Sequence, residues 1–419
     1  MKKLHTIAIV LMFITSNYFA SGFQINEQGS KAMAMGGAFT GLANDVSAIY
    51  FNPSGITQLS GTNFLVGATL ISPSASFRGP LPSITETKME KQLFTPIHFG
   101  ITHQVNDKLH LGFSVNNNYG LGTKWDKEWI GKFMAVETNI RTFFFTGVAS
   151  YKVSDILSLG FGYSFAYGDV LIGKKANLSP FNAEAYLELS GNGTGSGFTA
   201  GLLLTPSKAI SIGLSYRSEV RIDFTGDATA TGAPKQYDGL LPHGAIEAPL
   251  TTPSNITLGV AIKPNKKLTF TADYQYVGWA SYDKLEVKFN DYTFPDGTNN
   301  TASVRDYNNT FIARAGMEYL FSKSLALRAG ILYDKNPIDD SKVDPTLPDA
   351  DRLGFNAGIG YKLSKNLSVD LAYMFLRFDE RKITNSEESY SGISNSIAPM
   401  NGVYNSSAHL LSMTLSYNF

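Results

Sequence analysis

The chain has 419 residues, 35 of them basic and 35 acidic, so its formal charge is zero. This balance gives no indication of nucleic-acid binding or of electrostatic steering. There are no cysteines, which excludes disulfides and thiolate chemistry. The content of phenylalanine (28), tyrosine (21) and glycine (39), with only 17% charged residues, suits a membrane barrel with aromatic girdles, although a large soluble β-protein could share it.

The first 21 residues have the pattern of a secretory signal peptide. A basic start (Lys2 and Lys3) precedes an apolar core at 7–14 and small residues at 20–22. This core is too short to span a bilayer stably, and the cleavage point stays open among the three small residues. No later segment has the roughly 18 uninterrupted apolar residues of a transmembrane helix, so the exported chain is either soluble or a barrel.

Residues 22–60 do not alternate like a β-strand, whereas the rest of the chain does. A polar run at 24–28 leads into small residues between 32 and 41, and the segment continues to Asn52-Pro53-Ser54. Small residues let backbones pack closely, and the residue before a proline is held extended. We therefore expect a compact hatch of short helices and turns at 22–60, which fills a barrel built by residues 61–419.

These segments carry a resemblance to a known family. GFQINEQ at 22–28, the glycine-rich turn, NDVSA at 44–48 and NPS at 52–54 resemble the N-terminal hatch of the FadL/TodX family, outer-membrane transporters of long-chain fatty acids and other hydrophobic molecules. YRSEVRIDFTGD at 216–227 and LPDADR at 347–352 also resemble family stretches. The third residue of the hatch motif is usually alanine in the family, whereas this chain has Ser54.

The resemblance implies passive transport across the bacterial outer membrane. Cargo such as fatty acids or aromatic hydrocarbons would be captured at extracellular loops and transferred to a pocket in the lumen. It would then leave sideways through a kink in the third strand, next to the hatch. The resemblance implies no cofactor.

Turn signals after the hatch predict fourteen strands. Six short turns alternate with seven longer loops, which is the bacterial outer-membrane arrangement with both chain ends in the periplasm. The short turns fall at 106–108, 154–155, 206–208, 264–266, 322–323 and 364–366, and the longer loops at 73–90, 121–136, 173–182, 226–252, 291–302, 336–349 and 384–404.

Alternation within strands predicts a lipid face and a lumen face. In the last strand the apolar set Leu411, Met413, Leu415, Tyr417 and Phe419 shares one face, and polar residues share the other. The terminal phenylalanine resembles the signal by which the barrel-assembly machinery recognises outer-membrane barrels. Small residues line the inner face of the fifth strand, which leaves room for a hatch.

Asn117, Asn118, Tyr119 and Gly120 end the clean alternation of the third strand. Asparagine and glycine are poor strand formers, so this segment is expected to form the kink. Asn52 and Pro53 are expected to hold the hatch against it. The alternative is that the strand simply ends here and a loop begins.

The seventh strand has charges of alternating sign at Arg217, Glu219, Arg221 and Asp223. Because charges facing lipid near the middle of the bilayer cost several kcal/mol, all four are expected to point into the lumen. They would either brace the hatch as a ladder of ion pairs or bind a ligand directly.

Two apolar sets are candidates for ligand binding. Trp125, Trp129 and Phe133 lie in the loop after the third strand, where exposed aromatics could form an outer capture groove or anchor the barrel in the membrane interface. An inner pocket is expected where inward-facing residues become apolar, each buried methylene contributing about 0.8 kcal/mol. These inner positions are Val170 and Ile172 in the fifth strand and Met374, Leu376 and Phe378 in the thirteenth.

A carboxylate head group would need a cation. Lys174 lies where the resemblance places a basic head-group residue, and Arg314 and Arg377 are further candidates.

Catalysis has little support in the sequence. The six histidines show no metal-ligand spacing on a helix, so no metal site is expected. An outer-membrane lipase would need a serine and a histidine in one constellation, and His409 near Ser406, Ser407 and Ser412 is the sole superficial match. A structural or adhesive barrel is the other alternative. Outer-membrane lipid is an expected partner, and the hatch within the chain makes a monomer plausible.

Overall fold

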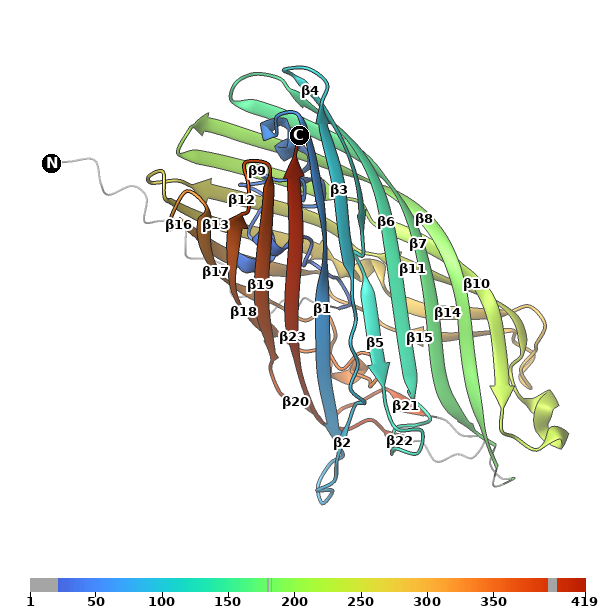
Figure 1. Ribbon diagram of the computed structural model, residues 1–419. Coiled ribbons are helices and arrows are strands. Elements are labelled where there is room, and N and C mark those ends of the chain that lie inside the picture. The colour runs from blue at the N-terminus through green and yellow to red at the C-terminus, as the bar shows by residue number, and fades with distance from the viewer. Residues whose placement is uncertain (1–21, 179–180, 182, 391–397) are drawn as a thin grey trace, which may run out of the picture.

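The computed structural model describes residues 22–178, 181, 183–390 and 398–419, so the expected signal peptide lies outside the described residues. The chain forms a closed antiparallel barrel of fourteen strands (Figure 1), as the turn pattern predicted. The wall closes where the first strand pairs with the last, from Asn63 opposite Asn418 to Arg78 opposite Val403. Among the described residues no helix is long and apolar enough to cross a membrane.

Several of the fourteen strands are interrupted, so they carry two labels. In chain order they are β1 (Thr62–Arg78), β2 with β3 (Glu86–Lys88, Ile97–Gln104), β4 with β5 (Leu109–Asn116, Gly120–Lys124), β6 (Glu137–Lys152), β7 (Leu157–Asn177), β8 (Glu184–Ser207), β9 with β10 (Ile210–Arg217, Val220–Thr231), β11 with β12 (Gly244–Thr252, Ser254–Ile262), β13 with β14 (Leu268–Gly278, Lys284–Phe289), β15 with β16 (Asn300–Val304, Thr310–Leu320), β17 (Leu325–Asp334), β18 (Arg352–Lys362), β19 with β20 (Leu367–Phe378, Arg381–Ile383) and β23 (Gly402–Asn418).

The remaining elements are short. Within the described part of the chain, β21 and β22 (Ser389–Tyr390, Ala398–Pro399) form a separate two-stranded sheet. The helices before the barrel are α1 (Ser30–Ala34), α2 (Ala48–Phe51) and η1 (Pro53–Gln58), and those between strands are η2 (Lys235–Leu240), η3 (Trp279–Ser281) and η4 (Asp340–Lys342).

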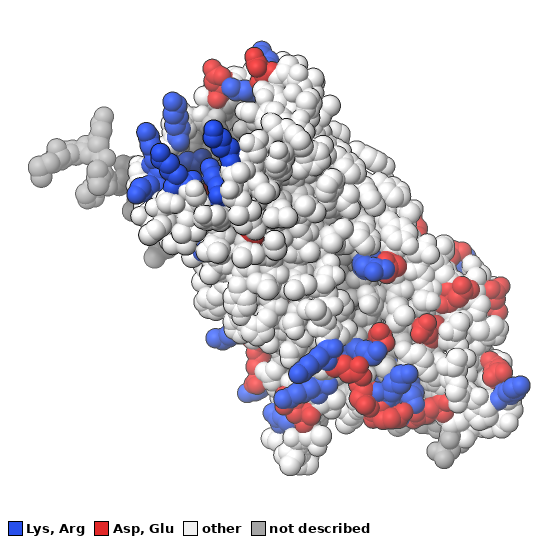
Figure 2. All heavy atoms as spheres, in the orientation of Figure 1, with Lys and Arg blue, Asp and Glu red and all other residues white. Residues whose placement is uncertain are grey.

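The outer surface of the barrel is an apolar belt. Leu411, Met413 and Leu415 of β23 are exposed on it, whereas Ser412 and Thr414 are buried in the lumen, as the alternation predicted. Phe161 and Tyr163 of β7 are each 58% exposed on the same outer face. Figure 2 shows a broad uncharged zone across this face, with charged side chains gathered towards its two ends. Such a zone fits the hydrocarbon layer of a membrane.

The hatch lies inside the barrel and packs backbone against backbone (Figure 1). A Cβ atom on Gly330 of β17 would stand 2.2 Å from the amide nitrogen of Gly36. A Cβ on Gly259 of β12 would stand 2.6 Å from that of Gly41. Glycines in the wall therefore make the space that the hatch occupies.

The prediction for the seventh strand is wrong for three of its four charges. Arg217 faces the lumen and donates to the carbonyl of Tyr50 at 2.9 Å. In contrast, Glu219 is exposed, and Arg221 and Asp223 form an outward-facing ion pair of 2.8 Å whose side chains are both 65% exposed.

A one-residue bulge causes the change of face. Thr199 of β8 pairs with Arg217, but further along Thr194 pairs with Asp223. Between these two pairs, four residues of β8 therefore oppose five of the seventh strand. The hydroxyl of Ser218, inside the bulge, accepts a hydrogen bond from the amide of Phe198. Beyond the bulge the apolar set Val220, Ile222 and Phe224 faces the lumen.

Candidate functional site

The wall is interrupted within the third strand. Asn116 at the end of β4 pairs with Phe144 of β6, whereas Gly120 at the start of β5 pairs with Arg141. Three residues, 117–119, therefore oppose two on β6, which defines a bulge. It falls within the segment that was predicted to kink.

On its other edge the third strand loses its neighbour at the same point. The ladder between β3 and β4 reaches its outer end at His98 opposite Asn116, and β5 pairs with β6 on the far side. Within the part of the chain that the structure describes, no ladder joins β5 to β2 or β3. An opening therefore lies between the second and third strands.

Hatch residues take the place of the missing neighbour. The amide of Ile25 donates to the carbonyl of Asn118, and the amide of Gly120 donates to the carbonyl of Phe23, both at 2.9 Å. Gln24 and Tyr119 form an antiparallel bridge between these two bonds. The first residues of the hatch are thus hydrogen-bonded directly to the kink.

Two glycines of β5 leave the opening free of side chains from that strand. Gly120 and Gly122 share the outer face, because they stand opposite Arg141 and Asn139. A Cβ on Gly122 would lie 1.9 Å from the ring of Phe94, and one on Gly120 would lie 2.8 Å from Ile25. The side chains of Phe94 and Ile25 therefore occupy the opening.

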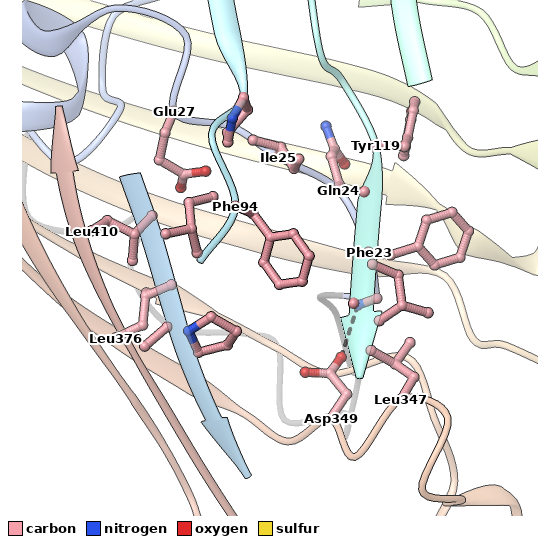
Figure 3. Close-up of a pocket in the computed structure, with 18 of the residues that line it drawn as sticks. Phe23, Gln24, Ile25, Glu27, Phe94, Tyr119, Leu347, Asp349, Leu376 and Leu410 are labelled. Atoms are coloured by element: carbon pink, nitrogen blue, oxygen red, sulfur yellow. Dashed lines mark hydrogen bonds between the residues drawn. The ribbon is translucent and has the colours of Figure 1, made fainter. Parts of the chain in front are cut away.

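The larger cavity, of about 730 Å³, runs from the lumen into this opening (Figure 3). Pockets of this size bind drug-sized ligands. Its inner lining includes apolar residues such as Leu376 and Leu410, together with the buried Asp349 and the half-buried Glu27 and Arg352. Its outer lining includes Arg141, Phe143 and Asp169, whose side chains are on the outer face of the wall.

A smaller cavity, of about 200 Å³, lies nearer the extracellular end. Val170, Ile172 and Lys174 of β7 line it together with the ion pair of Arg305 and Asp344. Burial lowers the pKa of the Lys174 ammonium, and the nearby positive charge of Arg305 lowers it further. Among the described residues, Lys174 makes no ion pair.

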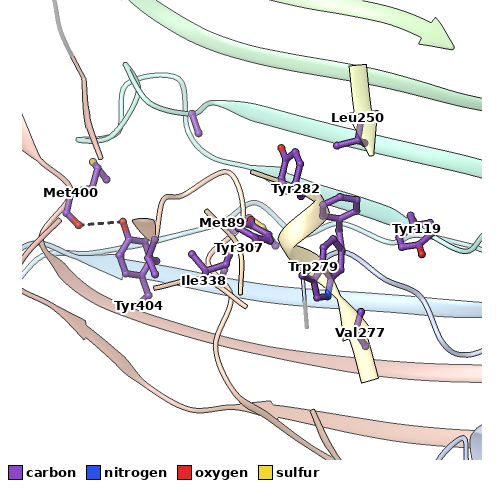
Figure 4. Close-up of a cluster of buried hydrophobic side chains, with 14 of the residues drawn as sticks. Met89, Tyr119, Leu250, Val277, Trp279, Tyr282, Tyr307, Ile338, Met400 and Tyr404 are labelled. Carbon is purple, nitrogen blue, oxygen red and sulfur yellow. Dashed lines mark hydrogen bonds between the residues drawn. The ribbon is translucent and has the colours of Figure 1, made fainter. Parts of the chain in front are cut away.

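The two cavities meet at four residues, Phe23, Leu121, Ile140 and Leu347, which line both of them. Phe23, in the hatch, is held in an aromatic cage by Tyr119, Trp279 and Tyr282, with ring centroids 6.1, 5.0 and 5.8 Å from its own. Figure 4 shows these three cage residues within a larger buried cluster. Phe23 therefore stands at the passage between the cavities.

Trp279 was not predicted from the sequence as a site residue. It lies in η3, which interrupts the ninth strand between β13 and β14, and its side chain is fully buried. The available signal was the sequence Gly278-Trp279-Ala280-Ser281, which breaks the alternation of that strand.

The inner-pocket candidates divide between the two cavities. Leu376, Phe378 and Arg314 line the larger one, whereas Val170, Ile172 and Lys174 line the smaller one. Met374 is buried under the hatch beside Met33 and does not reach either cavity lining. Arg377 was expected to serve the lumen, but its side chain is 64% exposed on the outer face, 3.5 Å from Asp379. The alternation that turns Leu376 inward turns Arg377 outward.

The tryptophans do not form an exposed groove, so that expectation is corrected. Trp125 and Trp129 are 0% and 5% exposed and stack with ring centroids 4.5 Å apart. Their indole N–H groups donate to the carbonyls of Pro345 and Ala135. They form the core of the extracellular loops, and Phe133 lies half-buried beside Lys132.

The hatch motif lies at a different part of the wall from the kink. The side-chain amide of Asn52 donates to the carbonyls of Thr40 and Leu202, at 3.1 and 3.0 Å. The Pro53 carbonyl accepts from Ser150, and the Ser54 hydroxyl donates to Asn52. The motif thus fixes the hatch to β6 and β8, so the expectation that it holds the hatch against the kink is wrong.

The lipase constellation is not assembled around His409. Its Nδ1 atom is 2.7 Å from the hydroxyl of Tyr373 on the outer face, while Ser412 faces the lumen and bonds to Ser30. The Ser406 hydroxyl donates to the carbonyl of Pro348. In the described ranges no group of three or more acidic, histidine or cysteine side chains is placed to hold a metal ion.

A fourteen-stranded barrel with an apolar outer belt, an internal hatch and an opening in its wall defines an outer-membrane transport barrel. The family model described as outer membrane protein transport protein (OMPP1/FadL/TodX) matches residues 11–419. The chain therefore belongs to the FadL/TodX family and is located in the bacterial outer membrane.

Individual relatives cover nearly the whole chain. It is 25% identical to the long-chain fatty acid transport protein of Escherichia coli O6:H1 strain CFT073, over 91% of this chain and 92% of the relative. A FadL homologue from Pseudomonas aeruginosa has a TM-score of 0.82 at 21% identity, covering 95% of this chain and 100% of that one. The toluene transporter TbuX of Ralstonia pickettii has a TM-score of 0.72 at 17% identity, covering 93% of this chain and 98% of that one.

Proposed function

We propose that this protein is a passive transporter of hydrophobic small molecules in the outer membrane. It releases them sideways through the wall of the barrel. Long-chain fatty acids and aromatic hydrocarbons are the cargo classes named for its relatives. The observation that carries the proposal is the larger cavity, because one continuous space is lined both by the lumen residue Leu376 and by the outward residue Phe143.

The proposed route has three stages. Cargo captured at the extracellular loops enters the smaller cavity, where Lys174 holds a carboxylate head group and Val170 and Ile172 contact the chain. It passes Phe23 into the larger cavity. It then leaves between β3 and β5 after Ile25 and Phe94 move aside.

Each part of the chain has its own role in this route. Residues 1–21 act as a removable signal peptide, 22–60 as the hatch and 61–419 as the barrel. Cofactors and catalysis are not needed, since burial of apolar surface alone drives capture. The barrel-assembly machinery inserts the protein, outer-membrane lipid surrounds it, and one chain is sufficient for the route.

A reversible lock on the hatch tests the route. Gln24 and Tyr119 form an antiparallel bridge, a position at which paired Cα atoms lie within disulfide range. In the double variant Gln24→Cys/Tyr119→Cys, oxidation should abolish transfer of a labelled fatty acid into vesicle lipid, and reduction should restore it. The native chain has no cysteine, so the lock is the one thiol pair present.

The control places the same chemistry in the wall away from the opening. Leu159→Cys/Leu202→Cys joins opposite residues of β7 and β8, and its oxidation should leave transfer unchanged. Equal transfer by the oxidised and reduced Gln24→Cys/Tyr119→Cys protein would rule out release beside the hatch.

A further inference from the structure

Arg141 stands at the outer mouth of the opening, on the membrane side of the wall. We propose that it binds the carboxylate of a departing acid and so favours release of anionic cargo over neutral cargo. This inference rests on the proposed sideways release and adds a residue that selects among its substrates.

The position of Arg141 follows from the ladder. It lies directly opposite Gly120 on β5 and directly opposite Asp169 on β7, all three on the outer face. Gly120 has no side chain, and the Ile25 side chain of the hatch fills the space over it. Arg141 and Asp169 line the cavity beside this point. The guanidinium is therefore next to the gap through which cargo would leave.

Arg141 keeps hydrogen-bonding capacity for a ligand. Its Nε donates to Asp169 at 3.0 Å, and its side chain is 63% exposed. No other hydrogen bond of this guanidinium occurs within the described part of the chain. Its terminal N–H groups form the planar fork that matches a carboxylate.

The depth of Arg141 in the membrane allows a charged side chain at this site. Along β6 the next outward residues towards the periplasm are Phe143 and Phe145, which belong to the apolar belt. Arg141 thus lies at the extracellular end of the belt, where the cost of an arginine falls to about 0–1 kcal/mol. An acid that places its carboxylate here has its chain beside the apolar layer.

The immediate surroundings favour an acyl carboxylate as the occupant. The gap itself is lined by the apolar side chains of Ile25 and Phe94, which suit a hydrocarbon chain. Inside the cavity, Arg352 lies 3.3 Å from Asp334, and Arg314 donates to the side-chain carbonyl of Gln275 at 2.6 Å. Arg141 is the cation that faces an anion as it emerges.

The test compares two cargoes that differ only in the head group. Wild-type protein and Arg141→Gln are reconstituted in phosphatidylcholine vesicles, and the transfer rates of an 18-carbon fatty acid and the matching alcohol are measured. The variant should transfer the acid about twofold to fivefold more slowly, the loss expected for one exposed ion pair. Transfer of the alcohol should change by less than about twofold.

The matched control is Arg221→Gln. Arg221 also forms an outward ion pair with an aspartate, at 2.8 Å, and it is equally exposed, but it lies on β10 and does not line the cavity. Its substitution should leave both rates unchanged. Asp169→Asn should keep acid transfer at least at the wild-type rate, because it frees the guanidinium.

The other outcomes of this experiment would contradict either the Arg141 proposal or the proposed function. Equal slowing of acid and alcohol by Arg141→Gln, or no slowing of either, would refute the head-group role. An effect that appears only after anionic lipid is added would assign Arg141 to a lipid phosphate instead. If wild-type protein transfers neither cargo, the proposed function itself fails, which is distinct from failure of the Arg141 proposal.

Discussion

Lys174 combines a buried ammonium group with an apolar surrounding at the extracellular end of β7. It lines the smaller cavity beside Val170 and Ile172, and its pKa is lowered chiefly by burial. A carboxylate in that cavity would offset the cost of burial, because an opposite charge favours the charged form of the lysine.

Binding at this residue should depend on pH in a head-group-specific way. As pH rises through the lowered pKa of Lys174, the ammonium loses its charge, so the affinity for a fatty acid should fall. The affinity for the matching alcohol should stay constant. Lys174→Gln should weaken acid binding by about tenfold and remove this pH dependence. Saturable binding to detergent-solubilised protein measures both, and an unchanged pH profile in Lys174→Gln would argue against the assignment.

At the scale of elements, the bulge at Ser218 explains why sequence reasoning succeeded within the belt and failed above it. The apolar residues of the seventh strand occupy even positions throughout, from Ile210 to Phe224. Inside the belt they face lipid. Above the belt the polarity of the two faces is reversed, because the lumen side lines the apolar cavity and the outer side is exposed to solvent. One extra residue turns the same apolar set from the lipid side to the cavity side.

Other parts of the site divide into those that a local sequence pattern predicts and those that depend on contacts between distant segments. Local pattern predicted the kink segment and the cavity positions Val170, Ile172 and Leu376, because each depends on strand alternation or on poor strand formers. Burial of Trp125 depends on a carbonyl of Pro345, 220 residues away. The position of the Asn52 side chain depends on its hydrogen bond to the carbonyl of Leu202. Contacts between distant segments of this kind are not contained in a local pattern.

The close packing of the hatch against glycines of the barrel wall gives a testable prediction. Gly330→Val should displace the hatch, because a Cβ there would lie 2.2 Å from the backbone of Gly36. The barrel should still assemble but admit small hydrophilic solutes, which a solute-influx assay on vesicles can measure. Gly147→Val is the matched control, since a Cβ at Gly147 has no neighbour within 4 Å. Influx equal to wild type in Gly330→Val would contradict this packing.

At the scale of the whole molecule, alternation and turn spacing were enough to predict the closed barrel, its strand number and its lipid face. Closure brings together the two ends of the barrel sequence. Phe419 packs against Phe64 with ring centroids 5.4 Å apart, and its amide donates to the carbonyl of Thr62. The last residue is nevertheless 71% exposed, so it contributes little to the packed core.

This exposure separates two roles for the terminal residue. Phe419→Ala should reduce the amount of folded protein in the outer membrane of cells, if the barrel-assembly machinery recognises the aromatic end. Refolding of the purified variant into detergent should be close to wild type, because few core contacts are lost. Equal loss in both settings would show that the side chain serves stability rather than recognition.

The opening lies at the extracellular end of the apolar belt, and this depth limits what the protein accomplishes. On the proposed route, a molecule that leaves beside Gly120 would arrive in the outer leaflet with its polar end at the surface. It would have entered the outer leaflet without crossing the bilayer. Flipping to the inner leaflet and desorption into the periplasm are then separate events, governed by the lipid and by whatever removes the molecule on the far side.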